Sequence, residues 1–387
     1  MAPGNDLFPD HDGTSFKAAA PGAPHPTGIL PAQGIHYLLR EGEIWASKPI
    51  DDDQVQPASL DLRLGPVAYR LRASFLPGPE RGVMERVKEL SLHEIDLSEG
   101  AVLEQGCVYL VPLIEALALS QRTSARANPK SSTGRLDVFT RVITDFGAEF
   151  DEVAPGYKGH LYLEIVPRTF PILVRMRSRL AQLRFRRGSP IHSDAETKRL
   201  HERTRLVDRA ADIRNGVAVT VNLKPLSSDG VIGFRAKRHS GLVDVDLRDG
   251  YDPLDFWEPL IARPGRGLIL DPDEFYILAS REFVHVPPTH AAEMIPYNPL
   301  VGEFRVHYAG FFDPGFGDNS AEGEGSRAVL EVRSHDVPFL IEHGQTIARL
   351  IYERLTDKPA QLYGEGIGSS YQRQGLKLSK HFKAVEL

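Results

Sequence analysis

LYLEIVPRTFPILVRMRSRLAQL, residues 161–183, is matched without a gap by AVLEVRSHDVPFLIEHGQTIARL, residues 328–350. Glu164 and Glu331 fall at equivalent positions, 167 residues apart. An internal repeat of this length indicates a duplicated domain. Each copy consists of short alternating segments punctuated by Pro and Gly, which is typical of an all-β barrel or jelly roll. The sequence therefore predicts a mainly β protein with two tandem barrels.

Composition limits the classes of function. With 387 residues the chain is long enough for two cores. Its net charge of −6 makes it poorly suited to binding a nucleic-acid polymer. Cys107 is the only cysteine, which excludes an intramolecular disulfide and any site with two thiolate ligands. A reducing, cytoplasmic setting is expected. Residues 1–28 contain no apolar stretch long enough for a signal peptide or a membrane span, and no membrane association is expected.

Changes in composition divide the chain into four segments. They are a disordered N-terminal segment (1–28), a first β domain (29–188), a connector (189–240) and a second β domain with a C-terminal lid (241–387). Within the connector, residues 193–203 indicate a charged helix with Ser193 as its N-cap. Residues 217–221 are expected to complete the edge of the first barrel, and residues 242–248 to open the second.

The two copies have kept different polar motifs. In the first copy, residues 130–135 (KSSTGR) form a cationic, hydroxyl-rich turn, and such groups donate hydrogen bonds to phosphate oxygens. The equivalent residues 297–302 lack those donors, but the second copy carries DPGF at 313–316, upstream of Glu331. One copy is therefore predicted to bind and the other to react, with the turn facing Glu331. Whether the two meet within one chain or between chains is open at this point.

Taken in order, these motifs resemble the deoxycytidine triphosphate deaminases of the dUTPase superfamily, in a long, duplicated form. The first copy supplies DLRLG at 61–65 and the turn, and the second supplies DPGF, the Leu330-Glu331 strand and YQRQG at 371–375. The similarity covers about residues 35–187 and 242–380. It implies two dUTPase-like jelly-roll barrels joined by a helical connector. It also implies a homo-oligomer, because single-domain members form trimers with sites between subunits.

The resemblance implies hydrolytic removal of the 4-amino group of dCTP, giving dUTP and ammonia and feeding thymidylate synthesis. Glu331 would be the general acid/base that takes a proton from the attacking water, a role that suits a buried carboxylate of raised pKa. No zinc is expected, because zinc-dependent nucleobase deaminases need a Cys-x-x-Cys pair and this chain has one cysteine. Mg²⁺ would arrive with the triphosphate, since it prefers phosphate oxygens and water.

Further roles follow from the same resemblance. Ser131 and Arg135 would act with Glu331 as catalytic residues, reaching the base or the attacking water. The implied substrate-binding residues hold the triphosphate, line the cytosine pocket, lie near the sugar or close the lid: Lys130, Ser132, Ala309, Asp313, Tyr363, Tyr371 and Gln374. Two positions depart from the family pattern. Lys130 replaces an arginine, which loses bidentate geometry, and Gly310 replaces a histidine beside the cytosine pocket.

Simpler interpretations stand beside these. Glu331 could be a strand carboxylate paired with Arg327 or Arg333, and the serines of the turn could form an ordinary polar turn. Glu164, which has no aspartate motif nearby, is expected to be structural. The alternative functions are a dUTPase, a bifunctional enzyme that converts dCTP to dUMP, and a nucleotide-binding regulator without turnover.

Overall fold

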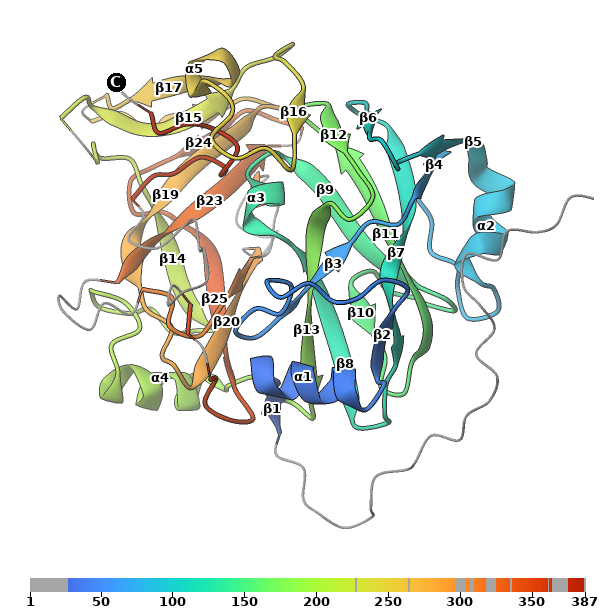
Figure 1. The fold of residues 1–387 in the computed structure, drawn as a ribbon. Helices are drawn as coiled ribbons and strands as arrows, with labels where there is room; N and C mark the ends of the chain where they lie inside the picture. The colour runs from blue at the N-terminus through green and yellow to red at the C-terminus, as the bar shows by residue number, and fades with distance from the viewer. Residues whose placement is uncertain are drawn as a thin grey trace, which may run out of the picture.

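Two β-rich halves lie side by side in the computed structural model, the first blue to green and the second mostly yellow to red (Figure 1). The structure describes residues 27–226, 228–263, 265–296, 304–306, 310–317, 325–334, 336–360, 362–363 and 375–385. The N-terminal segment that was predicted to be disordered lies outside these ranges up to residue 26. The mainly β fold predicted from the sequence is confirmed.

The first half contains three sheets. The sheet around β13 has the spatial order β1 (Gly28–Ile29), β13 (Arg179–Arg187), β8 (Thr123–Pro129) and β10 (Glu152–Val153), with β3 (Leu60–Arg63) also paired to β13. A second sheet has the order β5 (Ser91–Asp96), β4 (Val67–Leu71), β7 (Val108–Ala118), β11 (Lys158–Pro167) and β9 (Val138–Thr144), with β2 (Ile44–Ala46) on β7. β7 and β11 are buried over most of their length, as their continuous apolar runs require.

The small third sheet already joins the two halves. It consists of β6 (Ala101–Leu103), β12 (Ile172–Val174) and β16 (Val243–Asp244). The large sheet of the second half has the order β17 (Trp257–Ile261), β15 (Val231–Ala236), β19 (Phe275–Val284), β14 (Val217–Asn222), β25 (Thr346–Arg354), β20 (His290–Pro296) and β22 (Phe311–Phe312). β23 (Ser326–Ser334) pairs with β19 and with β21 (Phe304–Val306), and β18 (Leu268–Leu270) pairs with β24 (Phe339–Ile341).

Helices are short and lie around the barrels. They are α1 (Ala32–Arg40), α2 (Val83–Leu90), α3 (Ser131–Gly134), α4 (Asp194–Arg203) and α5 (Pro253–Phe256). α4 is the helix predicted in the connector. The Ser193 side chain accepts a hydrogen bond from the Glu196 N–H while Glu196 reaches back to the Ser193 N–H, so the N-terminus is closed by a capping box. Among the described residues, none of the helices is long and apolar enough to span a membrane.

The duplication is visible in the strand register. Glu164 on β11 lies opposite Leu110 on β7, and Glu331 on β23 lies opposite Ile277 on β19, so both pairs obey the 167-residue offset. A tyrosine contact repeats as well: the Glu104 N–H donates to the Tyr109 hydroxyl at 3.0 Å, and the equivalent Asp271 N–H donates to the Tyr276 hydroxyl at 2.9 Å. The repeat in the sequence therefore corresponds to a repeat of backbone pairing.

Two expectations about the boundary between the halves were wrong. Residues 217–221 do not complete the first barrel: they belong to β14, which pairs with β19 and β25 of the second half. Residues 242–248 do not open the second barrel, because β16 pairs in parallel with β12 of the first half. A two- to five-residue alternating segment shows that a strand forms, whereas its partner depends on tertiary packing. The second half thus begins inside the predicted connector.

One hydrophobic core extends across the boundary. It contains the barrel residues of the first half together with Trp257, Phe275 and Ile277 from the second and with Leu378 and Phe382 near the C-terminus. Edge-to-face aromatic contacts, with centroids 5.2 Å apart for Phe256–Phe382 and 5.9 Å for Trp257–Phe382, hold that C-terminal segment in place. The halves are therefore packed as one body.

Candidate active site

The KSSTGR turn connects β8 to β9 and is held by its own backbone. The Thr133 N–H donates to the Lys130 carbonyl at 2.8 Å, and the Arg135 N–H donates to the Ser131 carbonyl at 3.1 Å, which gives the single helical turn α3. Ser132 and Arg135 are buried, with 5% and 3% of their surfaces exposed, whereas Ser131 is half-buried. A turn this well ordered can present its hydroxyls and guanidinium in fixed directions.

Glu331 meets this turn within the same chain. It projects from β23 of the second half, and its Oε1 lies 3.9 Å from Arg135 Nε, an ion-pair distance that exceeds a hydrogen bond. Gly134 lies against the same carboxyl group, because a Cβ placed on it would lie 2.6 Å from Glu331 Oε2. The two motifs that the sequence predicted to face each other therefore do so inside one chain. The need for glycine at 134, which sequence reasoning had not assigned, follows from this approach.

The surroundings of Glu331 favour its protonated form. Burial raises the pKa of Glu331 to about 8, with the Asp137 charge adding to the rise and Arg135 opposing it. A carboxylate of this pKa accepts a proton and returns it near neutral pH. This is the property that acid–base chemistry requires of a single group.

A second ion pair lies beside the first, with its cation on β23 and its carboxylate just after the turn. Arg333 Nη2 donates to Asp137 Oδ2, and Arg333 also donates to Thr169 Oγ1 at 3.0 Å. Because side chains two residues apart share one face of a strand, Arg333 and Glu331 both point at the turn. Asp137, 1% exposed, stands two residues after Arg135. Sequence reasoning weighed Arg333 as the partner of Glu331, but the structure pairs it with Asp137.

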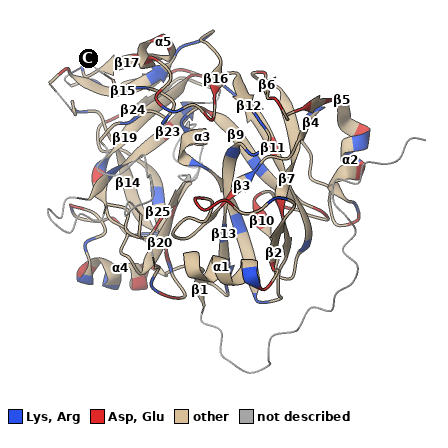
Figure 2. Cartoon of the chain, in the orientation of Figure 1, with Lys and Arg blue, Asp and Glu red and all other residues tan. Residues whose placement is uncertain are grey.

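Lys130 lies at the other end of the turn, against the first half. Its Nζ donates to Asp61 Oδ2, and Arg179 Nη1 stands 3.8 Å from the same oxygen. Asp61, on β3, is 2% exposed. Figure 2 shows basic positions along β13 and acidic positions in the loop that leads into β3, near the middle of the molecule. The DLRLG motif therefore supplies a carboxylate that holds the Lys130 ammonium.

Asp313 is placed by a residue from the opposite half. Arg184 Nη2, on β13, donates to Asp313 Oδ1 and to the Phe312 carbonyl, each at 3.3 Å, and its guanidinium stacks on Phe311 with 3.9 Å between its carbon and the ring centroid. Burial raises the pKa of Asp313, and the Arg184 charge opposes that rise. Lys130 and Asp61 also act on this carboxyl, so Asp313 faces the Lys130 end of the turn. Sequence reasoning had not identified Arg184.

The remaining predicted residues are only partly placed. The Tyr363 N–H donates to the Pro314 carbonyl at 2.9 Å, and its ring centroid lies 5.7 Å from that of Phe316, so Tyr363 packs on the DPGF loop. Ala309, Tyr371 and Gln374 lie outside the described residues and stay predictions.

Glu164 occupies the equivalent position in the first half but in a different setting. It is fully buried, and Arg141 donates to its Oε1 from Nη2 at 2.5 Å and from Nε at 2.9 Å. The guanidinium of Arg141 stacks on Phe150, with 3.6 Å between its carbon and the ring centroid. This carboxylate is committed to a short ion pair, in contrast to the 3.9 Å contact of Glu331. Its geometry is that of a structural residue.

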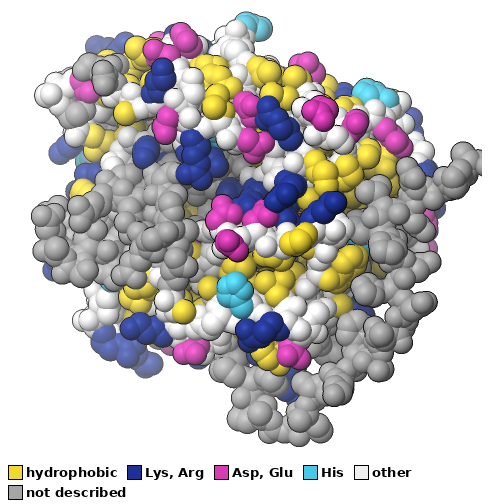
Figure 3. Space-filling model, viewed as in Figure 1, with side chains coloured by type: hydrophobic (Ala, Val, Ile, Leu, Met, Phe, Trp, Pro, Cys, Tyr) yellow, Lys and Arg dark blue, Asp and Glu magenta, His cyan; other side chains and the backbone are white. Residues whose placement is uncertain are grey.

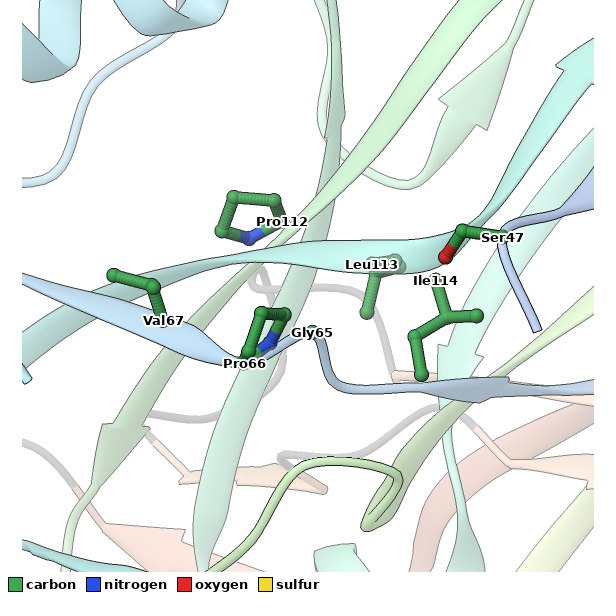
Figure 4. Close-up of a pocket in the computed structure, with 7 residues that line it drawn as sticks. All are labelled: Ser47, Gly65, Pro66, Val67, Pro112, Leu113 and Ile114. Atoms are coloured by element: carbon green, nitrogen blue, oxygen red, sulfur yellow. The ribbon is translucent and has the colours of Figure 1, made fainter. Parts of the chain in front are cut away.

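A pocket elsewhere in the first half does not fit a polyanion. It is lined by Ser47, Gly65, Pro66, Val67, Pro112, Leu113 and Ile114, none of which is charged (Figure 4). On the face shown in Figure 3, by contrast, basic and acidic side chains gather around a hollow near the centre. Within the described ranges, His, Cys, Asp and Glu form no group of three that could hold a metal ion.

Comparisons with known proteins place both halves in one family. Residues 26–189 match the N-terminal domain and residues 193–382 the C-terminal domain of 2′-deoxycytidine 5′-triphosphate deaminase. A 2′-deoxycytidine 5′-triphosphate deaminase from Agrobacterium tumefaciens is 60% identical with a TM-score of 0.83, covering 86% of this chain and 99% of its own. A dUMP-forming dCTP deaminase from Beutenbergia cavernae is 32% identical over 42% of this chain and 80% of its own length. A dCTP deaminase from Natronomonas pharaonis is 32% identical over 41% and 79%, respectively. The chain therefore belongs to the 2′-deoxycytidine 5′-triphosphate deaminase family.

Proposed function

We propose that this chain hydrolyses the 4-amino group of dCTP, giving dUTP and ammonia. The observation that carries the proposal is the buried Glu331 carboxyl, of pKa about 8, held against a cationic serine turn from the other half. Binding alone does not call for a carboxyl group poised near neutral pH beside a basic turn. Acid–base chemistry on a neutral heterocycle does.

In the proposed mechanism Glu331 moves two protons. Its carboxylate takes one proton from water as the water oxygen bonds to C4 of the cytosine ring, and passes that proton to the ring nitrogen N3. Glu331 then takes the proton of the new C4 hydroxyl and delivers it to the amino group, so that the C4–N bond breaks, the C4 carbonyl forms and ammonia leaves. Ser131 would orient the water or the base, and Arg135 stabilises the ionised form of Glu331.

The other end of the site fits the phosphates and the sugar. Lys130 and Ser132 would donate to the triphosphate, and Asp313, held by Arg184, would face the deoxyribose. Mg²⁺ would enter bound to the triphosphate as part of the substrate. Assembly into a homo-oligomer and a cytoplasmic location also stay proposals.

The direct test is incubation of the purified protein with dCTP and Mg²⁺, followed by anion-exchange separation of the nucleotides. Appearance of dUTP with one equivalent of ammonia supports the proposal. Appearance of dUMP, the product named for the Beutenbergia relative, would show that the chain also cleaves the triphosphate. If dCTP is bound but unchanged, the deaminase proposal is wrong and a regulatory role gains support.

The pH dependence should follow the ionisation of Glu331. Because its pKa in the empty site is raised from 4.5 to about 8, the base is mostly protonated at neutral pH. We expect kcat/KM for dCTP to rise with pH and to level off above about pH 8. The Asp137 charge raises this pKa, so Asp137→Asn should move the rise to lower pH. A wild-type rise centred near pH 4.5 would contradict the assignment of Glu331.

Gly134 should be intolerant of any side chain. In Gly134→Ala the new methyl group would lie 2.6 Å from Glu331 Oε2, so the carboxyl group or the turn must move. A misplacement of about 1 Å can cost on the order of a hundredfold in kcat. Steady-state kinetics with dCTP, alongside thermal unfolding to confirm the fold, measures the effect. Unchanged kcat would show that the close approach of Gly134 is not needed.

A further inference from the structure

The C-terminal strap, residues Lys377–Phe382, is anchored at the junction of the two halves. Leu378 and Phe382 are each 4% exposed and pack into the core of the first half. The Phe382 ring lies 6.4 Å, centroid to centroid, from Phe170 of that half and 5.2 Å from Phe256 of the second. The strap is therefore fixed in space before any ligand arrives.

This strap touches the catalytic turn at two points. Arg135 Nη1 donates to the Lys377 carbonyl at 3.0 Å, and Ser379 Oγ donates to the Ser132 carbonyl at 2.8 Å. Ser379 is 1% exposed, so its hydroxyl is shielded from water. The two contacts join segments that are more than 240 residues apart in the chain. They hold the guanidinium that stands beside Glu331 and the backbone of the predicted phosphate-binding serine.

His381 supports Ser379 from behind. Its Nδ1 lies 2.9 Å from Ser379 Oγ, and its Nε2 lies 2.9 Å from the Val245 carbonyl. Burial lowers the pKa of His381 to about 4, so the ring is neutral and carries one N–H, which Nε2 donates to the Val245 carbonyl. Nδ1 is then an acceptor, and the single Ser379 proton is shared between the Ser132 carbonyl and His381 Nδ1. Ser379 is thereby held between the turn and a buried imidazole.

Lys380 lies between Ser379 and His381 in the strap, and it is half-buried. Its carbonyl accepts a hydrogen bond from the Asp249 N–H at 3.0 Å, which fixes the backbone from which the side chain extends. Burial lowers the pKa of Lys380 to about 8, and the charge of Lys130 is the next largest cause. Because the preceding residue, Ser379, contacts Ser132, the strap places Lys380 beside the turn that begins at Lys130. The charges of Lys130 and of Asp61, which holds Lys130, act on the Lys380 ammonium there.

We propose that the strap is part of the active site, with Ser379 as a positioning residue for the turn and Lys380 as a second cation for the triphosphate. The inference rests on the proposed function in taking a nucleoside triphosphate as the ligand. Lys130 is already engaged by Asp61, so its ammonium offers the phosphates fewer donors than a free cation would. An ammonium delivered by the strap compensates for this loss at the same end of the turn.

The Lys380 arm of the test needs no turnover. Binding of inorganic triphosphate to the full chain is measured by calorimetry for wild type, Lys380→Gln and the control Lys383→Gln, which changes an exposed lysine just beyond the strap. Loss of a charge-assisted contact should weaken binding by about tenfold or more in Lys380→Gln and leave Lys383→Gln unchanged. In the kinetic assay, KM for dCTP should rise with kcat little affected. Equal binding by wild type and Lys380→Gln would overturn this role, even if the wild type deaminates dCTP.

The Ser379 arm separates positioning from simple stability. Ser379→Ala removes the bond to Ser132, so we expect kcat for dCTP to fall by about fivefold to tenfold and Ser379→Thr to restore part of it. As the turn relaxes, Arg135 should withdraw from Glu331, and the rise of kcat/KM should then move to higher pH. A lower Tm with kcat and the pH profile unchanged would mean that Ser379 is only structural. If no variant turns over dCTP, the function itself has failed, while the triphosphate-binding result still stands.

Discussion

Replacing Glu331 with glutamine is expected to abolish turnover of dCTP while leaving the chain folded. Glutamine keeps the shape of the side chain but can neither take a proton from water nor return it to the leaving amine. Removal of a positioned general acid/base costs about a hundredfold to ten-thousandfold in rate. The measurement is dUTP formation by anion exchange at pH 8, with binding of dCTP followed separately to show that the site is intact.

Glu164→Gln is the matched control, since Glu164 is the equivalent residue of the first half. Its carboxylate is engaged by Arg141 rather than by the turn, so activity should survive and stability should fall. Loss of activity in both variants would point to a shared structural role for the two glutamates. Loss of activity in Glu164→Gln alone would place the chemistry in the first half.

The same Glu331→Gln variant should be more stable than the wild type at alkaline pH. Because the folded-state pKa of about 8 lies above the ordinary value of 4.5, the folded chain loses stability as pH rises between these values and gains none back above them. Glutamine carries no such penalty, which is on the order of a few kcal/mol above pH 8. Thermal unfolding at pH 4 and pH 9 tests this, with a difference in Tm expected only at pH 9.

The second large effect is expected from Arg333→Met. This change leaves the Asp137 carboxylate, 1% exposed, without its cationic partner at the boundary between the halves. Breaking a buried ion pair on one side costs about 3–5 kcal/mol. Denaturant unfolding measures the loss, and the control is Arg214→Met, whose side chain is 77% exposed and whose removal should cost no more than about 0.5 kcal/mol.

The double variant Asp137→Leu, Arg333→Met distinguishes a pairing effect from lost packing. Because the unpaired charge is then gone, much of the stability should return, as it does when buried ion pairs are replaced by apolar residues. Activity should stay low, since the turn would no longer be aligned on β23. Additive losses in the double variant would show that Asp137 and Arg333 act independently.

The duplication and the contact between the turn and Glu331 could be predicted because both leave a pattern in the sequence. The 167-residue offset is a comparison of the chain with itself, and it gives the strand register as well as the fold. The serine turn stood out because the second copy lacks it, and Glu331 was distinguished from Glu164 because only the second copy carries DPGF upstream of its glutamate. A signal for Arg333 was present too: it lies two residues beyond Glu331 on β23, and strand periodicity puts such residues on one face. Asp137, with a φ of 56°, lies in the turn between α3 and β9, where that periodicity does not apply.

Other features had no such signal. The parallel pairing of β16 with β12 joins two-residue and three-residue strands, whose partners are chosen by the packing of whole barrels. Arg135 donates to the Lys377 carbonyl. Any residue type at position 377 would supply this backbone acceptor, so the sequence does not reveal the contact. Arg184 lies in a basic run, residues 175–187, yet it is 1% exposed and pairs with Asp313. Burial of one member of a basic run cannot be seen without the fold.

Because Arg135 and Glu331 belong to one chain, dilution cannot separate them. A site that forms between subunits is lost when the subunits dissociate, so its occupancy follows protein concentration. Here the covalent link and the shared core keep the local concentration of one half-site around the other constant. Duplication has thus converted an association equilibrium into a folding equilibrium, and each copy was free to lose the motif that its tethered neighbour supplies.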